Sequence, residues 1–158
     1  MNDLAKKVGR RLRAAGAMLV TAESCTGGWV SEVVTSVSGS SRWFERGFVT
    51  YSDAAKRQML GVRKKTLRKH GAVSQETARE MAKGALKRSR GSIAVAVTGV
   101  AGPTGGSAAK PVGTVCFAFV TPKRALSETQ HFKGDRESVR QQSVVRALEG
   151  VLELLDGG

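Results

Sequence analysis

The sequence is poor in the residues that cross-link small domains or hold them in a bilayer. It has two cysteines, Cys25 and Cys116, in 158 residues, too few for a disulfide framework. No apolar run approaches the roughly 20 residues of a membrane span, and the N-terminus lacks the apolar stretch and cleavage site of a signal peptide. These absences argue against disulfide-rich and membrane-spanning classes and predict a globular protein of the cytoplasm.

Acidic residues are also scarce, since 13 Asp and Glu stand against 26 Lys and Arg and give a formal net charge of +13. Such a balance points to an anionic partner, and nucleic acid is the first class to test. The basic residues, however, fall mostly in three runs (6–13, 63–69 and 83–90) that are typical of solvated helix faces. No recognition helix or base-stacking motif accompanies them, so we do not expect nucleic acid as a partner.

The hydrophobic pattern alternates between helical and strand periods along the chain. A chain of this length suits one α/β domain, which we expect to span residues 1–158. The pattern predicts a three-layer α/β/α sandwich whose central sheet is mixed, mostly parallel, and has five or six strands. The expected strands are 18–22, 47–51, 92–98, 112–121 and 126–132, and the expected helices are 4–15, 29–37, 52–60, 62–70, 75–88 and 135–155.

Two polar, glycine-containing turns, 23–28 and 99–107, follow the carboxyl ends of expected buried strands. In open α/β sheets ligands bind at that edge, because loops and helix N-termini converge there. Ser24 stands in the first turn just before a helix whose early N–H groups can stabilise a negative oxygen, an arrangement suited to a nucleophile. The alternative is that Ser24 or Thr26 only caps the helix.

A serine nucleophile needs a base, and neither His70 nor His131 is expected near the two turns. Lys56 is the preferred base, because the short helix that carries it starts at the same sheet edge. Burial and neighbouring positive charge would lower its pKa from about 10.4 towards neutrality, whereas the alternative is a solvated surface lysine. Tyr51, at the end of the preceding strand, would hold the lysine or donate to a leaving group, unless its hydroxyl points outward.

The turn 99–107 offers consecutive N–H groups to an anion but lacks the Gly-Lys-Ser/Thr ending of a triphosphate loop, so a monophosphate or carboxylate fits better. Arg136 and Arg140 lie four residues apart at the start of the last helix, where one of them could make a forked contact to phosphate. Surface pairing with Asp135 or Glu137 is the alternative. The sequence has no metal-ligand spacing, and we expect chemistry without a metal or a cofactor.

Six ordered motifs carry a resemblance to a known family. They are Ala22–Gly28, Gly47–Ser52 with Lys56, Gly71–Ser74, Thr98–Pro103 with Gly105 and Gly106, Lys110–Thr114, and Gly134–Arg136 with Arg140. Together they cover nearly the whole chain and resemble the CinA C-terminal domain family. The resemblance implies a three-layer α/β/α fold and a metal-independent amidase that hydrolyses nicotinamide mononucleotide (NMN) to nicotinate mononucleotide and ammonia.

The same resemblance implies roles for individual residues. Ser24 resembles the family nucleophile, Lys56 its base and Tyr51 a supporting catalytic residue. Backbone N–H groups of residues 26–28 or of the 99–107 turn would hold the oxyanion. The residues that would bind the substrate are Thr26, Gly27, Thr98, Gly99, Gly102 and Arg140.

The resemblance also suggests a homo-oligomer, either a dimer or a larger assembly. Trp43 and Phe44 would be interface anchors or ordinary core residues. The net positive charge would attract an anionic mononucleotide and help to keep Lys56 deprotonated. A rival hypothesis is a catalytically silent domain that acts in competence or DNA metabolism through its basic surface.

Overall fold

The structure, a computed structural model, describes residues 1–157. Within them, helices and strands alternate along the chain, and most elements lie where the hydrophobic pattern predicts them. The strands are β1 (Leu19–Glu23), β2 (Phe44–Val49), β3 (Ile93–Gly99), β4 (Thr114–Val120) and β5 (Ala125–His131). The helices are α1 (Asn2–Ala14), α2 (Trp29–Thr35), α3 (Asp53–Leu60), α4 (Lys64–His70), α5 (Gln75–Lys87) and α6 (Arg136–Asp156), and a short 3-10 helix covers Ser40–Arg42.

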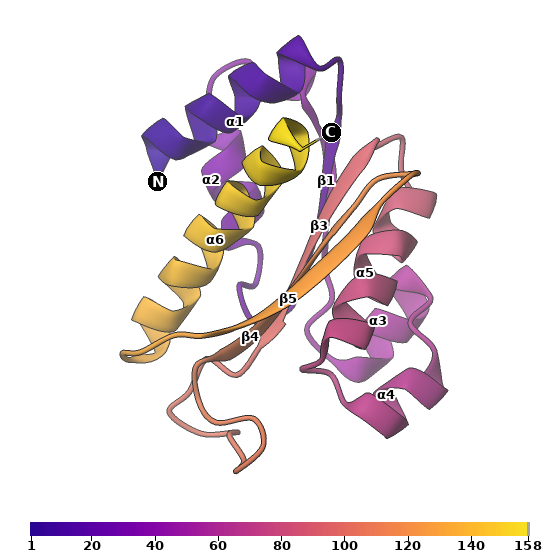
Figure 1. Cartoon of the computed structure of the whole chain (residues 1–158), viewed down its shortest axis with the longest axis vertical. Helices are drawn as coiled ribbons and strands as arrows, with labels where there is room; N and C mark the ends of the chain where they lie inside the picture. The colour runs from indigo at the N-terminus through magenta and orange to yellow at the C-terminus, as the bar shows by residue number, and fades with distance from the viewer. Residues whose placement is uncertain (158) are drawn as a thin grey trace.

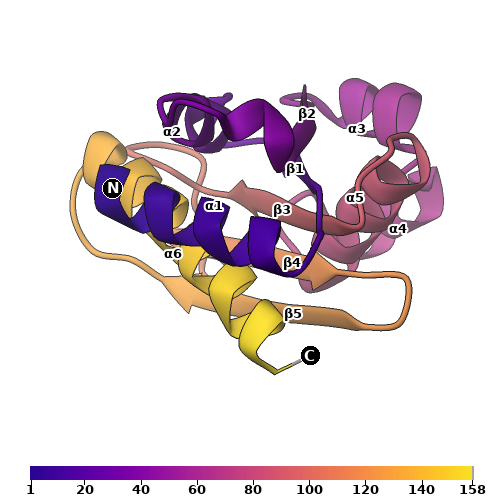
Figure 2. The same cartoon turned by 90° about the horizontal axis from the view of Figure 1, so that it is seen from above.

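The strands form one mixed sheet in the order β2-β1-β3-β4-β5. β1 pairs in parallel with both β2 and β3, whereas β4 pairs antiparallel with β3 and β5, so β4 alone runs against the other strands. Helices α1, α2 and α6 cover one face of the sheet, and α3, α4 and α5 cover the other (Figure 1 and Figure 2). The predicted three-layer α/β/α sandwich is confirmed, with five strands in its sheet.

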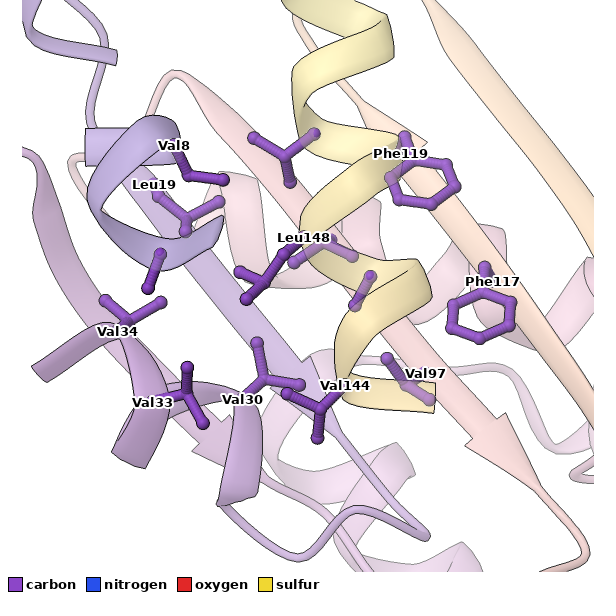
Figure 3. Close-up of a cluster of buried hydrophobic side chains, with 14 of the residues drawn as sticks. Val8, Leu19, Val30, Val33, Val34, Val97, Phe117, Phe119, Val144 and Leu148 are labelled. Carbon is purple, nitrogen blue, oxygen red and sulfur yellow. The ribbon is translucent and has the colours of Figure 1, made fainter. Parts of the chain in front are cut away.

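Each face of the sheet packs its own apolar core. Large branched and aromatic side chains, including Leu19, Phe117 and Leu148, fill the face under α1, α2 and α6 (Figure 3). The face under α5 is filled mainly by smaller side chains, such as Ala94 and Ala96. Because both faces are covered, β1 and β4 are buried along their whole length, and each appears in the sequence as a short apolar run.

Trp43 belongs to the first of these cores and is 2% exposed. Its indole ring lies against Gly9 of α1, where an added Cβ would stand 2.6 Å from Trp43 Cε2. The missing side chain at Gly9 therefore makes room for the ring, and Phe44 packs beside the same core. Of the two alternatives for Trp43, core packing is confirmed, and a role as an interface anchor is wrong because the ring is already buried.

β2 differs most from its predicted position, since it covers 44–49 rather than 47–51. It is an edge strand, and its residues are half-buried or exposed. Glu45 and Arg46 lie within it and interrupt the apolar pattern by which a buried strand is recognised. Tyr51 consequently lies just beyond the strand, where the chain turns into α3.

The longest helix within the described residues, α6, has 21 residues and buries an apolar stripe that includes Val144, Leu148 and Val151. Its N-terminus is capped by Asp135, whose carboxylate accepts a hydrogen bond of 2.9 Å from the N–H of Ser138. This cap fixes the first residue of α6 and thereby the place from which Arg136 extends. Across residues 1–157, no helix combines the length and the apolar character needed to cross a bilayer.

Candidate active site

Ser24 directly follows β1, and its N–H continues the β1–β3 pairing through a 2.9 Å bond to the carbonyl of Val97. Lys56 lies in α3, a helix whose start is fixed by Ser52, the Oγ of which accepts from the N–H of Ala55 at 3.0 Å. These two elements bring the side chains together. Lys56 Nζ lies 2.9 Å from Ser24 Oγ, and both residues are buried.

The Lys56 amine has three oxygen neighbours, namely Ser24 Oγ at 2.9 Å and the carbonyls of Thr50 and Tyr51, each at 3.1 Å. A carbonyl oxygen only accepts hydrogen bonds, whereas a hydroxyl can donate or accept. In a neutral amine the two N–H groups therefore point to the two carbonyls, and the lone pair faces the Ser24 hydroxyl. The backbone at Thr50 and Tyr51 thus orients the lone pair of the amine towards the serine hydroxyl.

Lys56 is 1% exposed, and this burial lowers its pKa below the ordinary value of 10.5. The negative charge of Asp53 raises the pKa, but its effect is smaller than that of burial. Neighbouring positive charge, the second cause predicted from the sequence, does not contribute, and that prediction is wrong. Removal of the amine from water is what favours its neutral form.

Glu23, the last residue of β1, holds the turn that contains Ser24. Its carboxylate is 1% exposed and accepts bonds from the N–H groups of Val30 (2.8 Å), Ser31 (2.9 Å) and Gly28 (3.2 Å). It also accepts from the hydroxyls of Thr26 and Ser31, each at 2.7 Å. One buried carboxylate therefore satisfies the N-terminus of α2 and fixes the path of the chain on both sides of the turn.

Glu23 is not among the site residues that the sequence pattern predicts. A signal was present, because a carboxylate that ends a buried strand and directly precedes a helix N-terminus has amide donors within reach. The contacts of Glu23 also change the picture for Thr26, a predicted substrate-binding residue. The Thr26 side chain is fully buried, and its hydroxyl is bonded to Glu23.

Arg140 supports the other side of the same turn. Its Nε donates to the carbonyl of Cys25 at 3.1 Å and its Nη2 to the carbonyl of Thr26 at 3.2 Å. The guanidinium also lies 5.3 Å from the centre of the Trp29 ring, a cation–π contact. Gly27 has a φ of 59° and faces Arg140, since an added Cβ would stand 3.7 Å from Arg140 Nη2. Arg140 therefore contacts the turn that contains Ser24, through the carbonyls of Cys25 and Thr26.

Tyr51 places its carbonyl and its hydroxyl in different surroundings. The carbonyl accepts from Lys56 Nζ at 3.1 Å and from Ser24 Oγ at 3.4 Å. The residue is 63% exposed, and its hydroxyl accepts from Arg136 Nη2 at 3.3 Å. The contact that holds the lysine is therefore made by the backbone of Tyr51, while its phenol points outward.

The segment after β3 leaves the sheet beside the turn that contains Ser24, because β1 and β3 are neighbouring parallel strands. Thr98 is 1% exposed, and its hydroxyl donates to the carbonyl of Ala72 at 2.8 Å. An added Cβ at Gly99 would stand 2.7 Å from Val115 Cγ2, and one at Gly102, whose φ is 85°, would stand 2.4 Å from Val112 Cγ1. Both glycines are thus needed for close packing of the loop, and Thr98 anchors it.

Cys25 follows Ser24 directly but is a poor candidate for the nucleophile. Burial raises the pKa of its thiol to about 12, and burial also raises the pKa of Cys116. A thiol that keeps its proton is a weak nucleophile. Within the described part of the chain, no three His, Cys, Asp or Glu side chains gather in a way that could hold a metal ion.

Two cavities of about 570 Å³ lie outside the Ser24–Lys56 pair. One is lined by His70, His131, Arg79 and Lys110, so both histidines face a cavity that Ser24 and Lys56 do not line. His131 pairs with Thr114, whose carbonyl accepts from the N–H of Val100, so it lies closer to the 99–107 turn than the sequence predicts. The other is at the far end of the sheet, beside Lys123 and the end of α5. Neither cavity includes Ser24 or Lys56 among its lining residues.

Fold and site together define an α/β domain with a buried serine–lysine pair at the carboxyl edge of a mixed sheet. The chain belongs to the CinA C-terminal domain family, whose sequence model matches residues 1–155. The predicted family resemblance is therefore confirmed.

Named relatives and a solved structure agree with this assignment. The chain is 56% identical to nicotinamide-nucleotide amidohydrolase PncC of Escherichia coli (strain K12), over 93% of this chain and 90% of that protein. It is 53% identical to the protein of the same name from Pseudomonas putida, over 98% and 96% of the two chains. The crystal structure of competence/damage inducible protein CihA from Agrobacterium tumefaciens superposes with a TM-score of 0.93 at 46% identity, over 98% and 94% of the two chains.

Proposed function

We propose that this chain is a nicotinamide-nucleotide amidase that hydrolyses NMN to nicotinate mononucleotide and ammonia, with Ser24 as nucleophile and Lys56 as base. The observation that carries the proposal is the 2.9 Å contact between Lys56 Nζ and Ser24 Oγ, in which two carbonyls fix the amine. The names of the relatives at 56% and 53% identity support the substrate.

The first half of the reaction forms an ester on Ser24. Neutral Lys56 takes the serine proton, and the alkoxide attacks the carboxamide carbon of NMN. Gly27 and Gly28 donate their N–H groups within the turn, to the carbonyl of Ser24 and to Glu23, and Thr26 is fully buried, which leaves the N–H group of Cys25 for the oxyanion. The protonated lysine then gives its proton to the leaving nitrogen, and ammonia departs.

The second half releases the acid. A water molecule loses a proton to Lys56 and attacks the ester carbon, and the lysine returns that proton to the Ser24 oxygen as the bond breaks. Nicotinate mononucleotide leaves, and the enzyme regains its starting protonation state. Gly99 and Gly102 would let the substrate approach the loop backbone closely, Thr98 would anchor that loop, and Arg140 would hold the turn in register.

The direct test is ammonia release from NMN by the purified protein. We expect Ser24→Ala and Lys56→Ala to lower kcat by roughly 10³-fold or more. Lys64→Ala, which removes an exposed lysine of α4, is the matched control and should leave the rate unchanged. Full activity in Ser24→Ala or Lys56→Ala would contradict the mechanism. Sedimentation of the same samples would test the homo-oligomer that we also propose.

A further inference from the structure

Arg136 lies across the end of β1, the strand that leads into the turn containing Ser24. Its Nη1 donates to the carbonyl of Gly102 at 2.7 Å, and its Nη2 donates to the hydroxyl of Tyr51 at 3.3 Å. Tyr51 follows β2 and Gly102 follows β3, and β1 lies between these two strands in the sheet. The guanidinium therefore crosses the sheet edge at the position where Ser24 leaves β1.

Arg136 and Arg140 differ in how many of their N–H donors are already used by the protein. Arg140 donates to the carbonyls of Cys25 and Thr26, in the turn that contains Ser24, and its guanidinium contacts the ring of Trp29. Arg136 uses two of the five N–H donors of a guanidinium, one of them in a long contact to an exposed hydroxyl. Within residues 1–157 it makes no ion pair with a carboxylate. Its charge and its remaining donors are thus available to an anion.

Tyr51 sets the distance between this cation and the reacting serine. Its carbonyl contacts Ser24 and Lys56, whereas its hydroxyl contacts Arg136. The guanidinium consequently lies about the length of one tyrosine side chain from the serine–lysine pair. In NMN a pyridine ring and a ribose separate the amide from the phosphate. One NMN molecule can therefore place its amide at Ser24 and its phosphate at Arg136.

We propose that Arg136 binds the 5′-phosphate of the mononucleotide and so makes the site prefer the nucleotide over the nucleoside; this inference rests on the proposed amidase function. A planar guanidinium gives two parallel N–H groups to a phosphate, which orients the ligand as well as attracting it. The exposed ring of Tyr51 then lies along the pyridine and ribose, and the amide is held at Ser24.

The cavity lined by Arg79 and Lys110 is the rival position for the phosphate. Its lining includes Cys116 of β4, which is two strands away from β1 in the sheet. The hydrogen bond from the Thr98 hydroxyl to the carbonyl of Ala72 lies between this cavity and Ser24. Lys110 nevertheless precedes β4 at the same edge of the sheet. Lys110→Gln therefore removes the same charge as Arg136→Gln and tests the rival directly.

The experiment measures ammonia release from NMN and from nicotinamide riboside, which lacks the phosphate. We expect Arg136→Gln to lower kcat/KM for NMN by roughly 10- to 100-fold, mainly through KM, because a charge-assisted contact to the ligand is lost. The same variant should leave kcat/KM for the riboside within about twofold of wild type. Lys110→Gln should leave both substrates unchanged.

Two results would overturn the proposal. An equal loss for both substrates in Arg136→Gln would mean that the residue only supports Tyr51 and Gly102, and a loss confined to NMN in Lys110→Gln would place the phosphate in the rival cavity.

If the wild-type protein hydrolyses neither substrate, the amidase function fails, and the phosphate site is then tested by calorimetric titration of Ser24→Ala with NMN and with the riboside. Tighter binding of NMN that disappears in the Ser24→Ala, Arg136→Gln double variant supports the site, and equal binding of both ligands overturns it.

Discussion

Lys56 Nζ lies 2.9 Å from Ser24 Oγ, although 32 positions separate the two residues in the chain. The contact exists because β1 and α3 end and begin at the same edge of the sheet, and because two carbonyls next to α3 accept the other hydrogens of the amine. Burial of the amine lowers its pKa, so the geometry and the solvation of Lys56 both favour the neutral base.

The pH dependence of kcat/KM should follow this lysine. The pKa of Lys56 is below its ordinary value of 10.5, and the reaction needs the neutral amine, so kcat/KM rises with pH and levels off with a midpoint below 10.5. Ammonia release from NMN over a pH series measures the midpoint. Lys64→Gln should show the same profile as wild type. A midpoint at or above 10.5 would exclude Lys56 as the base.

The unfolding free energy of the wild type should rise with pH because of Lys56. Between the lowered pKa of folded Lys56 and the unfolded value near 10.5, the unfolded chain binds more protons, so the wild type gains stability as pH rises. Lys56→Met removes this gain. The difference in unfolding free energy, variant minus wild type, should therefore decrease as pH rises towards 10.5 in urea titrations.

The pH trend is the test in that experiment, rather than the size of the difference at one pH. Methionine cannot donate to the carbonyls of Thr50 and Tyr51, and this loss adds a cost that does not depend on pH. A constant difference between Lys56→Met and wild type across the series would show that burial does not shift the lysine.

The sequence pattern predicted the layers of the fold and the edge at which Ser24 and Lys56 meet, because strand ends and helix spacing are local properties of the chain. It misplaced β2, since an edge strand is not marked by continuous apolar residues. It also assigned to the Tyr51 side chain a contact that the backbone makes, and it missed Glu23. Those features depend on which groups become buried together, and local periodicity carries no such information.

Glu23→Gln should destabilise the protein strongly. Either carboxylate oxygen accepts at least two bonds, so an amide nitrogen in its place would face donors such as the N–H and hydroxyl of Ser31. We expect a loss of about 2–4 kcal/mol in unfolding free energy, together with a lower kcat because the Ser24 turn loosens. Glu32→Gln, an exposed change on α2, is the control. Equal urea midpoints for the two variants would show that the Glu23 carboxylate does not hold the turn and the N-terminus of α2.

Thr50 provides the opposite case. Its Oγ1 is the one buried side-chain oxygen or nitrogen within residues 1–157 that lacks a hydrogen-bond partner. Valine has nearly the same shape without the hydroxyl, so Thr50→Val should raise the unfolding free energy by about 1 kcal/mol. The Thr50 carbonyl that accepts from Lys56 is retained, and kcat/KM for NMN should therefore stay unchanged.

Thr21→Val is the matched control for Thr50→Val, because Thr21 is equally buried but its hydroxyl pairs with Ser31 Oγ at 2.8 Å. Thr21→Val should lower the unfolding free energy, since the change removes the hydrogen bond between Thr21 and Ser31. If Thr50→Val were as destabilising as Thr21→Val, the Thr50 hydroxyl would have a partner in solution. If Thr50→Val kept its stability but released no ammonia, the hydroxyl would serve the reaction itself.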